Sequence, residues 1–188
     1  LVVANRAQKR AFKINDEVIA FSKHVADEAK IENSELVFAG YGVQAPEFQW
    51  DDFRGVDVKG KTIIVLVNDP PVAGPGGAVD SAIFGGKAMT YYGRWTYKYE
   101  EAAELGAAGV LIVHETEPAG YPFSVVQSSW TGEQFELPAN PEEPRVQLKG
   151  WVTEDAAKSL MALAGKQLDE LVSAAKTREF KPVPLGIT

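Results

Sequence analysis

The chain contains no cysteine, and histidine occurs only twice, at His24 and His114. The missing thiols exclude disulfide bonds and cysteine chemistry, although they do not fix the cellular compartment. No apolar run approaches the roughly 20 residues that a membrane-spanning helix needs, so we expect no membrane crossing. The sequence starts at Leu1 without a charged and apolar leader, and we expect a processed product or a piece of something longer.

Basic residues are also too few for a nucleic-acid-binding protein. Lysine and arginine total 19 against 26 aspartate and glutamate residues, which gives a net charge of −7. This field would repel a phosphate backbone, and no basic stripe offsets it locally. The remaining composition, 45% hydrophobic and 24% charged, is typical of a globular protein. We therefore expect a single domain with no nucleic-acid partner.

Catalytic motifs are missing or incomplete. The stretch "HETEP" begins like the zinc motif His-Glu-x-x-His, but Pro118 stands where the second histidine is required and would break the helix. The glycine-rich stretch 69–88 lacks the spacing of a phosphate-binding loop, and no Gly-x-Ser-x-Gly motif is present. The adjacent aspartates at 51–52 would point in different directions, so we interpret them as solvated charges.

The clearest local signals are apolar runs. Continuous runs at 63–67 and 110–113 predict two neighbouring strands that are buried on both faces, and a third strand is predicted at 36–38. Residues 69–88 hold five glycines and three prolines. Loops of that length are uncommon in compact domains and often functional. Residues 114–146, with five prolines, are predicted to be irregular as well.

Helix signals lie in the second half of the chain. Thr96 is predicted to cap a helix that ends at Gly106, with acidic residues at 100–101 near its positive end. Thr153 is predicted to cap a second helix that ends at Gly165, and a third follows over 166–176. The tail at 180–186 is predicted to be extended. Few helices and many strands indicate an α+β or mainly β fold.

Residues 11–25 allow two interpretations. Ile19, Phe21 and Val25 share one face of a strand, and Asn15 with its neighbour supplies turn chemistry, so a hairpin is favoured. Val18, Phe21 and Val25 also share a helical stripe, which would place a helix over 18–29. The domain is predicted to consist of an N-terminal hairpin or extension at 1–34, a core at 35–150, and C-terminal helices with an exit segment at 151–188.

Aromatic residues are concentrated in one short stretch. Four of the six tyrosines and one of the four tryptophans fall between Tyr91 and Tyr99. In one interpretation, Tyr97 and Tyr99 pack on the sheet while Tyr91 and Tyr92 brace the long loop. In the other, Tyr91, Arg94 and Trp95 face another domain or a peptide, because Tyr and Trp offer large apolar areas at low entropic cost and Arg binds carboxylates or stacks on rings. The candidate contact residues are Tyr91, Tyr92, Arg94, Trp95, Tyr97 and Trp130.

Three stretches together resemble a known family. They are "ELVFAGYGVQAPEFQWDDFRGVDVKGKTIIVLVNDPP", "FGGKAMTYYGRWTYKYEEAAELGAAGVLIVHETEPAGYPFSVVQSSWTG" and "FKPVPLG". They are similar to the protease-associated domain, and more narrowly to the version inserted in bacterial secreted zinc aminopeptidases related to glutamate carboxypeptidase and the transferrin receptor. The resemblance covers roughly residues 35–186.

The resemblance implies a swivelling β/β/α fold of packed sheets with a few flanking helices. It also implies a non-catalytic lid or interaction module beside a two-zinc site, whose ligands lie in a peptidase domain outside this chain. The expected partners are that peptidase domain and a peptide or protein substrate, and the expected location is secreted or periplasmic. No cofactor or metal ligand is expected in this chain, and no residue of it inherits a family role.

Two other function classes remain open on the residues alone. One is a free-standing binding module that uses the aromatic patch for carbohydrate or peptide. The other is an enzyme with His114 as a base near Glu115 or Asp80. A buried His114 that is remote from any cleft would remove the second alternative.

Overall fold

The computed structural model describes residues 1–135, 140 and 142–188. Its centre is a six-stranded sheet in the order β10-β4-β7-β8-β9-β3. The four inner strands are parallel, and both edge strands run antiparallel to their neighbours. The strands are β3 (Val18–Phe21), β4 (Leu36–Phe38), β7 (Thr62–Leu66), β8 (Gly109–His114), β9 (Leu148–Thr153) and β10 (Val183–Pro184).

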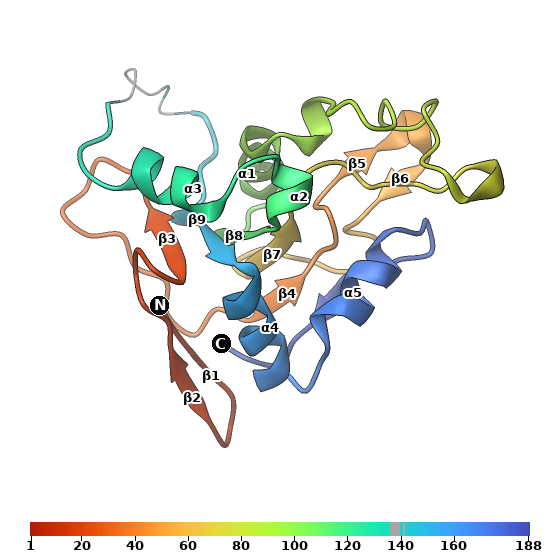
Figure 1. Cartoon of the computed structure of the whole chain (residues 1–188). Helices are drawn as coiled ribbons and strands as arrows, with labels where there is room; N and C mark the ends of the chain where they lie inside the picture. The colour runs from red at the N-terminus through yellow and green to blue at the C-terminus, as the bar shows by residue number, and fades with distance from the viewer. Residues whose placement is uncertain (136–139, 141) are drawn as a thin grey trace.

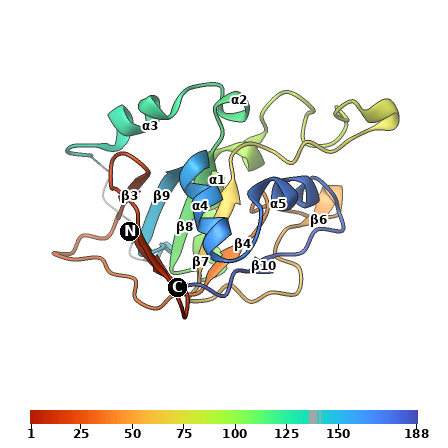
Figure 2. The ribbon, with the colours of Figure 1, turned by 60° about the horizontal axis from the view of Figure 1, so that its bottom comes forward.

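Helices cover both faces of this sheet, which explains why its inner strands β4, β7 and β8 are mostly apolar. Helices α4 (Glu154–Leu163) and α5 (Leu168–Ala175) pack on the face that contains Ile64 and Leu66. Helices α1 (Trp95–Glu104) and α3 (Phe123–Trp130) pack on the opposite face, with Ile63 and Val65. Figure 2 shows α4 and α5 together on one side of the sheet. The α+β class is confirmed.

The smaller elements lie around the sheet. A hairpin of β1 and β2 holds the N-terminus, and a second small sheet of β5 and β6 follows β4 (Figure 1). Both chain ends lie close together, because Ala4 and Thr188 exchange two backbone hydrogen bonds of 2.7 and 2.9 Å. The remaining bounds are β1 (Val2–Ala4), β2 (Lys9–Ala11), β5 (Gln44–Ala45), β6 (Trp50–Asp51), α2 (Thr116–Ala119), and the 3-10 turns η1 (Pro46–Phe48), η2 (Pro75–Gly77) and η3 (Tyr91–Gly93).

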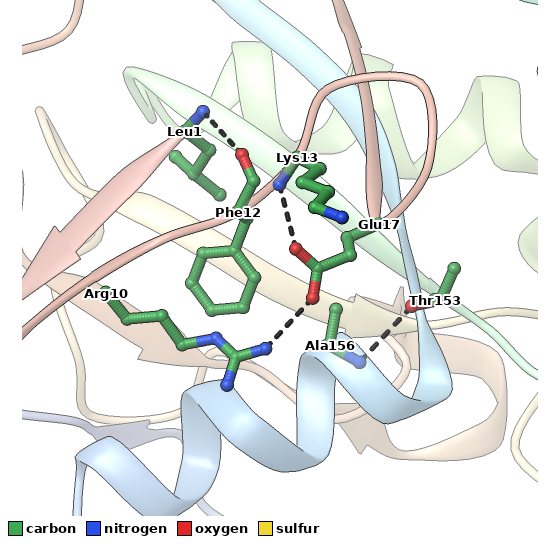
Figure 3. Close-up of polar contacts among 7 residues, drawn as sticks. All are labelled: Leu1, Arg10, Phe12, Lys13, Glu17, Thr153 and Ala156. Atoms are coloured by element: carbon green, nitrogen blue, oxygen red, sulfur yellow. Dashed lines mark hydrogen bonds and ion pairs between the residues drawn. The ribbon is translucent and has the colours of Figure 1, made fainter.

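Figure 3 shows polar contacts within the N-terminal segment and, close by, the cap at the start of α4. The N–H of Thr153 joins the two by donating to the carbonyl oxygen of Glu17 at 3.0 Å. Glu17 accepts hydrogen bonds from the backbone N–H of Lys13 at 2.8 Å and from Nη2 of Arg10 at 2.9 Å. The Lys13 hydrogen bond is the largest cause that lowers the pKa of Glu17. Close by, Thr153 caps α4 by accepting from the N–H of Ala156 at 3.2 Å, which confirms the predicted cap.

Several other sequence predictions are confirmed. The runs at 63–67 and 110–113 form β7 and β8, which pair in parallel, and β4 lies at the predicted place. Gly106 and Gly165 both adopt the left-handed conformation just past a helix end, as their positions predict. Residues 166–176 contain α5, and the extended tail contributes β10. The long stretch 69–88 is irregular apart from η2 and one isolated bridge.

The favoured hairpin at 11–25 is wrong, and so is the alternative helix. β3 pairs with β9, more than a hundred residues later in the chain, from Val18 opposite Val152 to Phe21 opposite Lys149. Gly150 permits this pairing, because a Cβ there would lie 2.1 Å from the carbonyl oxygen of Ile19. The turn at Asn15 is confirmed by its positive φ of 70°.

Two predictions about helices are also corrected. α1 begins at Trp95, so Thr96 lies inside it, and no side chain caps this helix. The first turn contains no acidic residue, which places the glutamates at 100–101 in the middle of the helix. The stretch 114–146 contains α2 and α3 in place of a fully irregular segment. Tertiary packing of Val126 and Trp130 stabilises α3 despite the weak local signal.

Candidate functional site

The aromatic stretch forms η3 and the first half of α1. The helical turn divides its residues between two environments. Tyr97, Lys98 and Tyr99 are buried, whereas Tyr91 and Arg94 are exposed. The candidate residues are therefore distributed between the core and the surface. Tyr97 lies in the core, as the packing interpretation proposed, and Tyr91 and Arg94 lie on the surface, as the contact interpretation proposed.

The tyrosines form one group. Tyr92 and Tyr97 meet edge to face with centroids 5.0 Å apart, and Tyr91 meets Tyr97 in the same way at 5.8 Å. The hydroxyl of Tyr92 donates to Glu47 at 2.6 Å, and that of Tyr91 donates to Glu100. The pKa of Tyr92 is raised to about 12, first because of the hydrogen bond to Glu47. These tyrosines brace the β5–β6 region and the surface of α1.

The tryptophans form a second group. Trp95 and Trp130 meet edge to face with centroids 5.1 Å apart, and Trp130 stacks on Phe21 at 4.5 Å with an interplanar angle of 9°. Trp95 also contacts Tyr99 at 6.0 Å. Trp130 thus lies in the same patch as Trp95 although 35 positions separate them in the chain, and α3 carries it there.

A cleft of about 710 Å³ opens beside the tryptophan group. We call it the aromatic cleft, and its wall includes Ser22, His24, Trp95, Tyr99, Arg145 and Lys149. Nζ of Lys149 lies 5.3 Å from the ring centroids of both Phe21 and Tyr99. Arg145 donates to the carbonyl oxygen of Lys23 at 3.4 Å and to Glu143 at 3.3 Å. The aromatic cleft therefore combines ring faces with charged side chains of both signs, since Glu100 and Glu143 also line it.

A second, smaller cavity of about 220 Å³ lies at the N-terminal end of α1. We call it the helix-end cavity. Gly93, Arg94, Trp95 and Thr96 line one side of it, and Trp151 of β9 lines another. Trp95 and Thr96 belong to the walls of both hollows, so the first turn of α1 stands between the aromatic cleft and the helix-end cavity.

Beneath the tyrosines lies a buried polar centre that the sequence did not predict. The ammonium of Lys98 donates to three carbonyl oxygens, those of Tyr41 at 2.6 Å, Asn68 at 3.0 Å and Tyr92 at 3.2 Å. Burial lowers the pKa of Lys98 to about 8. Because Tyr41 and Asn68 follow β4 and β7, Lys98 joins the loops at the carboxyl ends of these strands to the segment that precedes α1.

Asp52 belongs to the same centre, and its interpretation as a solvated charge is wrong. Its side chain is only 1% exposed, and it accepts hydrogen bonds from the N–H groups of Tyr41 and Val43 and from Nε1 of Trp50. Burial raises the pKa of Asp52 to about 7. The sequence did contain one signal for this centre: Lys98 lies between Tyr97 and Tyr99, both of which are buried in α1.

His114 lies in the core and lines neither hollow. It is 3% exposed, its ring contacts those of Tyr121, Phe123 and Trp151, and burial lowers its pKa. This placement does not support the alternative in which His114 acts as a base. Among the residues that the structure describes, no three His, Asp or Glu side chains converge as metal ligands, and no helix is long and apolar enough to span a membrane.

Comparisons with known proteins give one distant similarity. No protein-family model matches the sequence, and no curated protein matches it significantly. Among solved structures, the chain is similar to an aminopeptidase from Aneurinibacillus sp. strain AM-1, with a TM-score of 0.39 and 16% sequence identity. The match covers 88% of this chain and 28% of that one. A likeness at this level does not define a fold or a function.

Proposed function

We propose that the chain is a non-catalytic protease-associated domain of a zinc-dependent aminopeptidase, and that it controls access of a peptide to the active site. The proposal rests on the sequence resemblance over residues 35–186 and on one observation from the structure. That observation is the aromatic cleft, whose wall includes Trp95, the ring against which Trp130 packs, and both basic and acidic side chains. Its volume of about 710 Å³ falls within the usual range for ligand sites.

The chemistry of the aromatic cleft suits an extended peptide. Rigid ring faces such as Trp95 provide contact area at little entropic cost, and Arg145 and His24 provide polar groups at the wall. The protein as a whole carries a net charge of −7, whereas the wall of the aromatic cleft carries the cations Lys23, Arg145 and Lys149 against the acids Glu100 and Glu143. This mixed lining suits a ligand that brings both donors and acceptors, as a peptide backbone does.

The rest of the proposal concerns the longer protein. The two zinc ions would be held by a catalytic domain outside these residues, and the protein would be secreted or periplasmic. The tyrosine group, with Tyr91 54% exposed, would lie against that catalytic domain. The chain itself would contribute contact surface and leave the hydrolysis to its partner domain.

The test is peptide binding by the isolated chain, followed through tryptophan fluorescence. Unstructured peptides are expected to bind saturably, and Trp95→Ala is expected to weaken binding by at least about tenfold, which corresponds to 1.4 kcal/mol. Tyr91→Ala is the matched control. It removes an exposed aromatic ring from η3, directly before α1 and outside the aromatic cleft, and we expect it to leave binding unchanged.

Three results would contradict the proposal or part of it. Release of product from an amino-acid anilide by the pure chain would show that it is catalytic. Retention on polysaccharide columns together with indifference to peptides would favour the carbohydrate-binding alternative. Equal losses from Trp95→Ala and Tyr91→Ala would move the contact surface away from the aromatic cleft.

A further inference from the structure

We propose that His114 is an acid-sensitive latch, and that a proton gained by its ring releases residues 115–130 from the end of the sheet. We call this segment, which contains α2 and α3, the α2–α3 cap. The inference goes beyond the proposed function, because it concerns a movement of the fold that needs no peptide. Three observations support it: ring contacts, nitrogen atoms without partners, and a lightly attached cap.

The imidazole of His114 lies between the α2–α3 cap and the sheet. His114 is the last residue of β8 and is 3% exposed. Its ring centroid lies 5.5 Å from that of Tyr121 and 5.4 Å from that of Phe123, and both of these residues belong to the cap. A third ring, that of Trp151 in β9, lies at 6.0 Å. The imidazole therefore joins the cap to the sheet.

The nitrogen atoms at this contact lack acceptors. Nε2 of His114 and Nε1 of Trp151 are both buried, and neither has a hydrogen-bond partner among the described residues. An imidazolium carries an N–H at both ring nitrogens, and an indole can only donate. A proton gained by His114 would therefore place a charged N–H beside a neighbour that is unable to accept it. Because burial of an unpaired charge is unfavourable, the protonated ring favours a conformation in which water reaches it.

The ionisable groups around His114 do not offset this effect. Burial lowers the pKa of His114, backbone hydrogen bonds of His114 and Tyr121 oppose the shift, and among the described residues no charged side chain contributes to it. Burial raises the pKa of Glu115, so its titration would hold the cap more firmly in acid and does not replace that of His114. α3 has no ionisable side chain. Those of the neighbouring elements are Tyr99, Glu115, Glu117, Tyr121, Lys149 and Glu154.

The α2–α3 cap is lightly attached to the rest of the chain. Val126 is its only buried residue. Nδ2 of Asn68 donates to the carbonyl oxygen of Pro118 at 3.0 Å, and Nε2 of Gln127 donates to that of Asn15 at 2.6 Å. Segments with few buried contacts open at a low cost in free energy. A change at one ring contact is therefore sufficient to shift the balance between a closed and an open cap.

Acid is expected to open the cap for this reason. The closed cap favours the neutral ring, whereas in the open cap the ring regains its ordinary pKa of about 6.5. The open population should therefore rise by up to about tenfold for each unit by which the pH falls below 6.5. Trp130 at the end of α3 stacks on Phe21 and packs against Trp95. Opening would separate Trp130 from both rings and change the wall of the aromatic cleft.

The experiment follows the nitrogen-15-labelled full chain by NMR from pH 8 to pH 5. It compares the titration of the His114 imidazole with the indole N–H signal of Trp130, which is assigned by its loss in Trp130→Phe. The indole signal is expected to move toward the position of a solvent-exposed indole, with the midpoint of the His114 titration and below pH 6.5. The backbone N–H signal of Leu160, which is fully buried in α4, is expected to stay in place, because the rest of the domain remains folded.

Two substitutions at position 114 test the latch. His114→Phe keeps a ring between the cap and the sheet but accepts no proton, and His114→Gln is smaller and remains neutral. Both are expected to keep the Trp130 signal at its pH 8 position down to pH 5. The matched control is His24→Gln, which removes the other histidine of the chain and is expected to leave the transition unchanged.

Several outcomes would overturn the inference. A His114 midpoint at or above its ordinary value would mean that the surrounding rings stabilise the cation. An immobile Trp130 signal, a different midpoint for it, or a transition that survives in both variants would each remove the latch. If neither variant folds, as judged by the Leu160 signal, the two midpoints of the unsubstituted protein decide. Peptide binding at the aromatic cleft is measured at pH 8, where the cap is closed, so either proposal can fail alone.

Discussion

The inner and outer faces of the segment 91–100 carry the same kinds of residue and differ in what surrounds them. On the inner face, Tyr99 donates to the carbonyl oxygen of Gly150 at 3.1 Å, and Lys98 holds three carbonyl oxygens. On the outer face, Tyr91 donates to Glu100 across the exposed surface. The ammonium of Lys98 and the hydroxyl of Tyr99 bind carbonyl groups of segments that are distant in the chain. The hydroxyl of Tyr91, in contrast, binds a side chain only nine residues away.

Aromatic clustering in a sequence therefore does not by itself indicate a binding surface. The residues toward the sheet form structure, and the residues at the start of α1 border the two hollows. The inner face is therefore expected to determine stability, while the outer face and Trp95 are expected to determine binding. Substitutions on the two faces should separate these properties.

The largest effect is expected from Lys98→Met. This substitution keeps the apolar stem and removes an ammonium that three buried carbonyl groups share, so it should lower the free energy of unfolding by about 3–5 kcal/mol. Urea denaturation measures it. The matched control is Lys166→Met in the exposed turn after α4, which should change stability by less than about 0.5 kcal/mol. Equal effects would contradict a structural role for the inner lysine.

The second prediction concerns the pH dependence of stability. The pKa of Asp52 is raised from 3.8 to about 7 by burial, so the folded protein holds a proton that the unfolded chain releases in this range. Stability should therefore fall as the pH rises from about 4 to 7, by up to about 1.4 kcal/mol per pH unit. The pKa of Lys98 is lowered from 10.5 to about 8, so its contribution should make stability rise again from about pH 8 to 10.5.

Asp52→Asn should remove the first slope and leave the second. Urea midpoints across this pH range, measured for both proteins, give the comparison. The slope is the test, since the substitution also disturbs the hydrogen bonds from Tyr41 and Val43 and lowers stability at every pH. If the slope persists in Asp52→Asn, the pH dependence of stability arises from other carboxyl groups. Glu115 is one such group, since burial also raises its pKa.

The sequence was sufficient to predict the parts of the fold that local chemistry determines. β7 and β8 are runs of branched apolar residues, and α4 has a side-chain cap and a terminal glycine. The partner of β3 was not predictable in this way, because Val18 pairs with a strand whose place depends on the whole sheet. Nor was the burial of Asp52, which depends on the loops after β4 and on Trp50.

The candidate site was predictable to a similar degree. Residue type indicated that Trp95 and Trp130 could share a surface, and α3 does bring them together. The separation of the tyrosines from the tryptophans follows from where α1 begins, and the predicted start at Thr96 was wrong. Trp151 gave no sequence signal as part of a hollow, since its position in β9 indicates only a core residue.

The third prediction compares two hydroxyl groups. Tyr99→Phe keeps the ring contacts with Trp95 and Phe21 but removes a buried hydrogen bond, so it should lower the free energy of unfolding by about 1–2 kcal/mol. Tyr91→Phe removes the exposed hydrogen bond to Glu100 and should change stability by less than about 0.5 kcal/mol. Thermal or urea unfolding measures both. Reversal of this order would contradict the division between the faces.

The smallest effect is expected where the two faces meet. Tyr92 is half-buried and its hydroxyl donates to Glu47, so Tyr92→Phe should lower the free energy of unfolding by about 0.5–1 kcal/mol near neutral pH. The same hydrogen bond raises the pKa of Tyr92 from 10.0 to about 12, so stability should fall as the pH rises through this interval. Tyr92→Phe should lose less stability there than the unsubstituted protein. The ultraviolet absorbance of phenolate, followed during the titration, should show one fewer late-ionising tyrosine in the variant. An unchanged titration would show that the Tyr92 hydroxyl does not bind Glu47, and so does not connect η3 with η1.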